Sequence, residues 1–237
     1  MRVIEYNNAN DITVEFQDKY KAKVHTSWRY FRNGNIKNPY YPSVYGVGMV
    51  GNKYPVGENW KDTKEYKAWH HILERCYDNK LKEKRPTYQD AVCCDEWLCF
   101  ENFYKWLHCQ DNFDKWYFGN RWAVDKDILV KGNKVYSPET CCLVPDYINV
   151  VFAKRHRGKL PTGVTINYQR YQAGCTNPFT KKREYLGTYD TMEEAFQKYK
   201  QRKEEIIKQI AEREYVNGNI VRQCYEAMTK YQVESED

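Results

Sequence analysis

Residues 121–152, RWAVDKDILVKGNKVYSPETCCLVPDYINVVF, carry more structural information than any other stretch of this chain. Trp122, Val124 and the run 128–130 have the composition of a strand, and residues 131–134 (KGNK) have that of a turn. A second short apolar run follows at 141–144. These features predict two strands joined by a turn.

A helix is expected directly after the second apolar run. Pro145 suits the entry to a helix because its fixed φ and missing N–H cost nothing there, and Asp146 places a carboxylate in the first turn. The whole stretch is therefore predicted to form a compact strand–turn–strand–helix finger, and the rest of the chain is expected to support it.

Composition indicates a globular chain. It has 237 residues, of which 41% are hydrophobic, with 22 Tyr and 7 Trp, so aromatic rings are expected to supply much of the buried surface. Some of these rings could instead stack on nucleic-acid bases. The nine cysteines include no C-x-x-C pair, which indicates a reducing compartment rather than a disulfide framework. No apolar run approaches the length of a membrane span and the first residues lack a signal-peptide pattern, so we expect a soluble cytoplasmic protein with no membrane partner.

The net charge of +6 is concentrated in one part of the chain. Residues 153–190 contain eight Lys or Arg against two acidic residues, and the charges elsewhere cancel. This distribution predicts a phosphate-binding surface, for which the resemblances given below imply double-stranded DNA as the partner, whereas the alternative is an ordinary solvated face. The candidate DNA-binding residues are Lys154, Arg155, Arg157, Lys159, Arg170, Lys181, Lys182 and Arg183.

The chain reads as three segments of an α+β protein. Residues 1–60 predict a small β unit, since Ile12, Val14 and Phe16 alternate with polar residues and a hairpin over 3–6 and 12–16 is expected. This unit is expected to serve in packing or in weak nucleic-acid contact.

Residues 61–157 predict two helices that support the finger. One begins near Thr63, with Asp62 or Thr63 as its cap and with Tyr66, Trp69 and Leu73 on one face. The other follows Trp97. Structural zinc sites have ligands paired two to four residues apart, and this pattern is missing here, so buried thiols are expected in place of zinc.

Residues 158–237 predict a three-stranded sheet followed by helices. Strands are expected over 160–164, 168–173 and 183–189. Thr191 and Glu194 form the sequence pattern of a capping box, which places the start of a long helix there, and residues 220–231 predict a final packing helix.

The finger resembles the HNH-type (His-Me finger) endonucleases of phages and mobile elements, in particular a phage-encoded HNH-like subgroup. Lys126 stands where the catalytic His of that family would stand. The motifs that carry the resemblance are Asp125-Lys126-Asp127, Gly132-Asn133, Tyr136-Ser137-Pro138-Glu139 and Ile148-Asn149, together with Trp69-His70, Arg75-Cys76-Tyr77, Pro86-Thr87-Tyr88 and Cys94-Asp95-Glu96-Trp97.

The resemblance implies a site for one divalent cation, Mg²⁺ or Mn²⁺. It implies Asp125 as first ligand, Asn149 as a ligand from the helix and Asp127 as a further one, with Asn133 as the turn residue that orients the base. Lys126 is a poor general base, because its ordinary pKa of about 10.4 would have to fall by roughly 3 units. We expect Lys126 to bind a phosphate oxygen instead. A metal-bound water or His156, seven residues after Asn149, would then supply the nucleophile or the base.

The C-terminal segment resembles the APETALA2-type DNA-binding domain, which lays a three-stranded sheet into the major groove. The resemblance is carried by Gly163-Val164, Leu186-Gly187-Thr188-Tyr189 and Glu194-Ala195-Phe196. Arg170, Lys182 and Arg183 match the strand region with which that family reads bases, and its Trp positions are largely absent.

Three functional classes follow from these features. The first is a phage or mobile-element DNA-binding protein that acts as a divergent metal-dependent HNH-type endonuclease in the host cytoplasm. The second is a catalytically inactive DNA-binding or regulatory protein. The third is a phage effector that binds a host protein.

Overall fold

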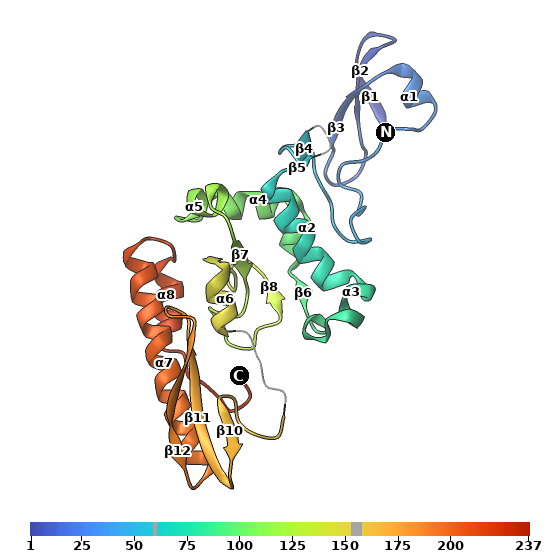
Figure 1. Ribbon diagram of the computed structural model, residues 1–237. Coiled ribbons are helices and arrows are strands. Elements are labelled where there is room, and N and C mark those ends of the chain that lie inside the picture. Colours follow the sequence, from blue (N-terminus) through green and yellow to red (C-terminus); the bar gives the residue numbers. More distant parts are fainter. Residues whose placement is uncertain (59–60, 153–157) are drawn as a thin grey trace. The chain divides into compact units, whose positions relative to one another are not determined.

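The computed structural model describes residues 1–58, 61–152 and 158–237. Helices alternate with several small sheets, which confirms the expected α+β class (Figure 1). Internal contacts group the chain into two compact units, one of residues 1–109 with 134–138 and the other of residues 110–133 with 139–237. These two units differ from the three segments expected from the sequence. That the three segments are separate domains stays a prediction.

The first unit begins with an antiparallel sheet in the order β1-β2-β3, followed by a short helix. Ile12 and Val14 of β2 are fully buried and their neighbours are not, so the period-two pattern places one face of the sheet on a small core. The hairpin expected over residues 3–16 is confirmed. The elements are β1 (Arg2–Asn8), β2 (Asp11–Glu15), β3 (Lys23–Thr26) and α1 (Trp28–Arg32).

The helical part of the first unit is built around large aromatic side chains. Trp69, Trp97, Phe100 and Phe103 are fully buried, and the indole Nε1 of Trp69 donates to the Trp97 carbonyl at 2.7 Å. The expected cap of the first helix is confirmed, because the Thr63 hydroxyl accepts from the Tyr66 N–H. The helices are α2 (Lys64–Tyr77), α3 (Asn79–Lys84) and α4 (Phe100–His108), with 3-10 turns at Pro86–Tyr88 and Asp95–Leu98.

Short strands complete this unit. The strand β8 (Val135–Tyr136) lies parallel to β6 (Val92–Cys93), and this ladder assigns residues 134–138 to the first unit although they lie within the finger in sequence. The guanidinium of Arg75 on α2 donates to the hydroxyl of Tyr136 at 3.3 Å. This side-chain contact also holds residues 134–138 to the first unit. A further small hairpin joins β4 (Gly57–Glu58) and β5 (Lys61–Asp62).

The second unit contains the rest of the finger as two antiparallel strands and a helix. Trp122 pairs with Pro145 and Asp125 with Cys142, and the helix begins at Asp146, directly after the second strand. Residues 128–130, which were predicted to extend the first strand, form none, because the Asp125 carboxylate accepts from the N–H groups of the following residues and turns the chain. The elements are α5 (Phe113–Phe118), β7 (Trp122–Asp125), β9 (Cys142–Pro145) and α6 (Asp146–Phe152).

A three-stranded antiparallel sheet and a long helix form the remainder of the second unit. The sheet has the order β10-β11-β12, and Thr191 and Glu194 form the predicted capping box at the start of the helix. The strand boundaries lie a few residues from those expected, because the chain turns at Tyr168 and Gln169, both with positive φ. The elements are β10 (Val164–Asn167), β11 (Arg170–Asn177), β12 (Lys182–Tyr189), α7 (Met192–Val216) and α8 (Arg222–Thr229).

The helix α7 connects two parts of one core in the second unit. Ala195, Phe196 and Tyr199 lie in its first half, whereas Ile206 and Ile210 follow in its second half, and all five belong to a single buried cluster that also includes residues of β9, β11, α6 and α8. Because these residues are buried on one face of α7, apolar residues recur in its sequence at helical spacing. Among the described residues, no helix is long and apolar enough to cross a membrane.

Candidate functional site

Asp125 ends β7 and its carboxylate serves the local backbone. Its Oδ1 accepts from the N–H groups of Asp127 and Ile128, both at 2.8 Å. Burial raises the pKa of the Asp125 carboxyl, and the two backbone N–H groups act in the opposite direction. Asp125 is therefore a carboxylate with few polar neighbours, a type of group that a cation would stabilise in its charged form.

Lys126, Asp127 and Asn133 are brought together in one hydrogen-bonded network. The Lys126 ammonium donates to Oδ1 of Asp127 at 2.6 Å and to the carbonyl of Asn133 at 2.9 Å. The side-chain amide of Asn133 donates in turn to the Lys126 carbonyl at 2.8 Å. These hydrogen bonds join the two ends of the loop 126–133. They lie inside the loop, because Lys126 is only 7% exposed.

Asn149 lies on α6, the helix of the finger, and α6 packs against β7 and β9. Its Oδ1 is buried and has no hydrogen-bond partner in the described part of the chain. A buried acceptor of this kind is costly unless something donates to it or it binds a cation. Hard cations such as Mg²⁺ and Mn²⁺ take carboxylate and amide oxygens, so the donor types of Asp125 and Asn149 fit such an ion.

The described residues do not bring the predicted metal ligands together as a full set. Those residues contain no group of three or more His, Cys, Asp or Glu that could hold a metal ion. Asp127, the further predicted ligand, is engaged by Lys126. His156 lies outside the described residues, as do Lys154, Arg155 and Arg157.

The β10–β12 sheet separates its two faces clearly. Ala173 and Cys175 of β11 are buried against α7, and Glu184 of β12, paired with Cys175, lies on that same face. The Glu184 carboxylate accepts two hydrogen bonds from the Arg202 guanidinium of α7, at 2.6 and 3.0 Å. This bidentate contact, followed by the Asn177 amide, lowers the pKa of Glu184 to about 2. The inner face is thus fixed to the helix.

The outer face of the sheet carries basic, aromatic and small polar side chains. By the strand register, Arg183 pairs with Thr176 and Thr188 with Gln172, and both pairs lie opposite to the helix face. Arg170 lies at the other end of β11 and forms an exposed ion pair with Asp190 at 2.8 Å. Tyr185, 64% exposed, lies between these positions. We call this surface, formed by Arg170, Gln172, Thr176, Arg183, Tyr185 and Thr188, the outer sheet face.

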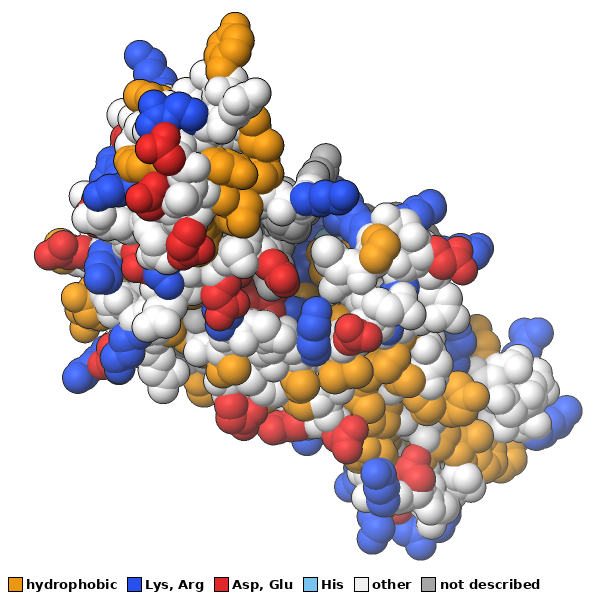
Figure 2. Space-filling view, turned by 90° about the horizontal axis from the view of Figure 1, so that it is seen from below, with side chains coloured by type: hydrophobic (Ala, Val, Ile, Leu, Met, Phe, Trp, Pro, Cys, Tyr) orange, Lys and Arg blue, Asp and Glu red, His pale blue; other side chains and the backbone are white. Residues whose placement is uncertain are grey.

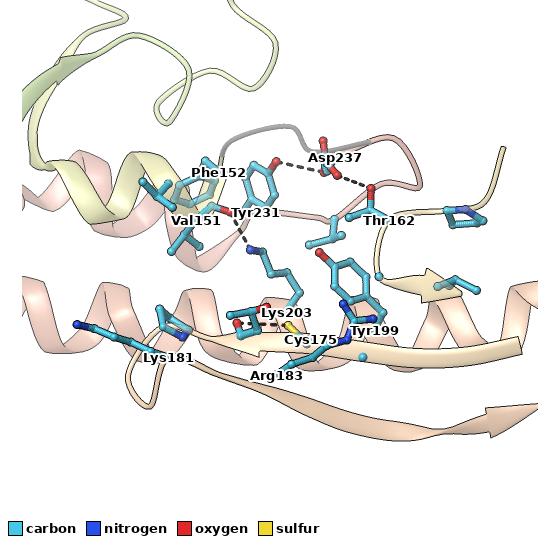
Figure 3. Close-up of a pocket in the computed structure, with 18 of the residues that line it drawn as sticks. Val151, Phe152, Thr162, Cys175, Lys181, Arg183, Tyr199, Lys203, Tyr231 and Asp237 are labelled. Carbon is cyan, nitrogen blue, oxygen red and sulfur yellow. Dashed lines mark hydrogen bonds between the residues drawn. The ribbon is translucent and has the colours of Figure 1, made fainter. Parts of the chain in front are cut away.

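The predicted basic residues do not all meet in one place. Lys159, Lys181 and Arg183 line one cavity of about 890 Å³ in the second unit, whereas Arg170 lies at the far end of its strand and Lys182 is exposed at the start of β12 (Figure 3). Figure 2 shows that, on the face it presents, Lys and Arg side chains alternate with Asp and Glu and with apolar areas. Of the described basic residues, Arg170 and Arg183 therefore belong to the outer sheet face, and Lys159, Lys181 and Arg183 line the cavity.

Two cavity residues escaped the sequence analysis. Lys203 extends from α7 and its ammonium donates to the Val151 carbonyl of α6 at 2.8 Å (Figure 3). Arg213 stacks on the ring of Phe179 with its guanidinium 4.5 Å from the ring centre. Both lie on a helix rich in charged residues. From the sequence alone they cannot be distinguished from the solvated charged residues beside them.

Comparisons with known proteins add no assignment, because no family model, no curated protein and no solved structure matches this chain.

Proposed function

We propose that this chain binds double-stranded DNA and that the outer sheet face is its contact surface. The observation that carries the proposal is the division of the sheet, with α7 covering one face while Arg170, Arg183 and Tyr185 lie on the other. The major groove, about 12 Å wide, admits strands as well as helices. A three-stranded sheet open on one side supplies a surface of that kind.

The side chains of the outer sheet face suit contacts with both the phosphate backbone and the base edges of DNA. Arg residues bind phosphates and pair with guanine edges, and Thr and Gln hydroxyl and amide groups reach other base edges. The Arg170–Asp190 ion pair is exposed on both sides, at 52% and 82% of the two side chains, so it contributes little and is readily exchanged for a phosphate contact.

The test is a salt titration of duplex binding. Replacing Arg170 and Arg183 of the outer sheet face, together with the exposed Lys182 next to Arg183, by Ala should weaken binding and flatten its dependence on salt concentration, because fewer counterions are released. The matched control replaces Lys198, Lys208 and Arg222, which are exposed on α7 and α8, and removes the same charge from another surface of the same unit. Equal salt slopes for the two triple variants would exclude the outer sheet face as the contact surface.

Metal-dependent hydrolysis of DNA phosphodiester bonds is a second candidate activity. It is supported by the ββα order of β7, β9 and α6 and by the two oxygen donors that these elements carry, Asp125 and the unpaired buried Oδ1 of Asn149. A bound Mg²⁺ or Mn²⁺ would polarise a phosphate oxygen and lower the pKa of a bound water. The network that engages Lys126 makes DNA binding the better supported of the two activities.

A phage or mobile-element origin and binding to a host protein stay predictions from the sequence, since no contact in the described residues favours either.

A further inference from the structure

The cavity of the second unit lies at an open strand edge. β10 ends its pairing opposite Ala173, so β11 beyond Gly174 has no strand partner on that side within the described chain. The cavity, about 890 Å³ in volume, is formed there by this edge, the end of α6, the middle of α7 and the segment after α8 (Figure 3). Its volume lies within the range of small-molecule sites, and a free strand edge offers N–H and C=O groups to a ligand.

Aromatic rings form much of the cavity wall. Phe152 and Tyr231 meet edge to face on one side of it, with ring centres 4.8 Å apart. Tyr199 approaches from α7 and Phe179 from the β11–β12 turn. Planar ligands stack on such rings with little dependence on their substituents, which is how proteins bind nucleobases without selecting one sequence.

The charges around the cavity favour an anion. Lys203 crosses it from α7, and its ammonium donates to the Val151 carbonyl at 2.8 Å (Figure 3). Lys181 and Arg183 form no ion pair among the described residues. Among the described residues of the wall, Asp237 supplies a carboxylate, and this carboxylate is paired with Lys131 at 2.7 Å.

Arg183 is positioned by the backbone beneath it. A Cβ added to Gly174 would lie 2.8 Å from the Arg183 Nε, so the guanidinium occupies the space that any other residue at position 174 would fill. Arg183 thus lies at the rim that joins the outer sheet face to the cavity.

From these features we propose that the cavity binds a nucleotide, with the base against the aromatic wall and the phosphate at Lys203 and Arg183. The ligand chemistry has two sources, a free mononucleotide or a nucleotide that leaves the stack of a bound duplex. The first source is measured without DNA, so its outcome is independent of whether the outer sheet face binds a duplex.

The first experiment titrates the full chain with AMP, GMP, CMP and TMP by isothermal calorimetry, with adenosine and inorganic phosphate as partial ligands. We expect saturable binding of at least one nucleotide at one site per chain. Adenosine and phosphate should each bind at least about tenfold more weakly, because each lacks one of the two contacts. Adenosine binding as tightly as AMP would overturn the assignment of the phosphate to Lys203 and Arg183.

Variants locate the binding. Lys203→Gln removes the charge and retains a donor near the Val151 carbonyl, and Arg183→Gln removes an exposed charge that no described contact needs for folding. Each should weaken nucleotide binding by at least about tenfold, the scale of one lost charged hydrogen bond. Lys208→Gln on α7 and Arg170→Gln at the far end of β11 are the controls and should leave it unchanged. Should Lys203→Gln fail to fold, Arg183→Gln decides the result.

The second experiment uses a duplex that contains 2-aminopurine, whose fluorescence rises when the base leaves the stack. A rise, measured with the duplex saturated by protein, that Lys203→Gln reduces, with no binding of free mononucleotides, assigns the cavity to a nucleotide of the duplex. Binding of free mononucleotides with no rise assigns it to the free ligand. The proposal is overturned if neither probe responds, or if both variants respond as the wild type does.

Discussion

The ammonium of Lys126 lies 2.6 Å from the Oδ1 of Asp127, its neighbour in the chain. The same ammonium donates to the carbonyl of Asn133, and Lys126 is almost completely buried. Lys126, which the resemblance to HNH-type endonucleases would align with a catalytic His, is therefore engaged inside the finger, where it stabilises the loop 126–133. Binding a phosphate would require that these two contacts be released.

Replacing Lys126 by Met should lower the free energy of unfolding by about 1–3 kcal/mol, because the part-buried carbonyl of Asn133 loses a donor. Losing the contact with Asp127 should cost less, because the Asp127 side chain is half exposed and water can replace the ammonium there. Urea unfolding measures the change. Lys134→Met, at an exposed position nearby, is the control and should have little effect. Equal stabilities of the two variants would show that the Lys126 network does not stabilise the finger.

If the finger cleaves DNA, supercoiled plasmid with Mg²⁺ or Mn²⁺ should be nicked, and removal of the metal by EDTA should abolish nicking. Asp125→Asn keeps an oxygen that accepts from the N–H groups of residues 127 and 128 and removes the charge, so it should reduce cleavage by at least about 100-fold without unfolding the turn. Asp114→Asn, an exposed position on α5, should have no effect.

Lys126→His should raise any such cleavage, since an imidazole has a pKa near neutrality and serves as a general base. Gel separation of nicked and supercoiled plasmid measures both changes. Intact plasmid with either metal, for the wild type and for Lys126→His alike, would leave DNA binding without hydrolysis as the activity of the chain.

The contact between Glu184 and Arg202 should make the second unit sensitive to acid. The pKa of Glu184 is lowered from 4.5 to about 2, chiefly by the Arg202 guanidinium. A lowered carboxyl pKa contributes stability that is fully present above the unfolded value and is lost as the pH falls from about 4.5 towards about 2. Glu184→Gln should therefore lower the melting temperature at pH 7, and its difference from the wild type should shrink below pH 4.

Thermal melts between pH 7 and pH 2.5 measure this difference. Glu212→Gln, at an exposed position of α7, is the control and should follow the wild type over the whole range. A difference between Glu184→Gln and the wild type that stays constant down to pH 2.5 would contradict the role of the ionised carboxylate.

Two glycines with positive φ separate backbone strain from steric overlap. At Gly132 (φ +76) an added Cβ meets nothing within 4 Å, whereas at Gly163 (φ +82) it would lie 2.0 Å from the Tyr199 ring. Gly132→Ala should cost about 1 kcal/mol from the backbone alone. Gly163→Ala should cost about 2–4 kcal/mol, because the ring of Tyr199 must also move. Chemical unfolding compares the two, and similar losses would show that the sheet and α7 separate easily at this point.

The sequence by itself determined the features that depend on near neighbours in the chain. The hairpin of β1 and β2, the Thr63 cap of α2, the capping box of α7 and the order of two strands and a helix in the finger follow from side-chain period and from residues that satisfy helix ends. These signals act over a few residues, so they can be read before the fold is known.

Only the tertiary structure decided what depends on contacts between distant parts of the chain. The parallel pairing of β6 with β8 assigned residues 134–138 to the first unit, and the packing of α6, α7 and β11 formed a cavity that both Lys203 and Arg183 line. The engagement of Lys126 also depended on where the loop returned Asn133. In each case the residue type was visible in the sequence, but its partner was set by the burial of apolar surface over the whole unit, which no local pattern encodes.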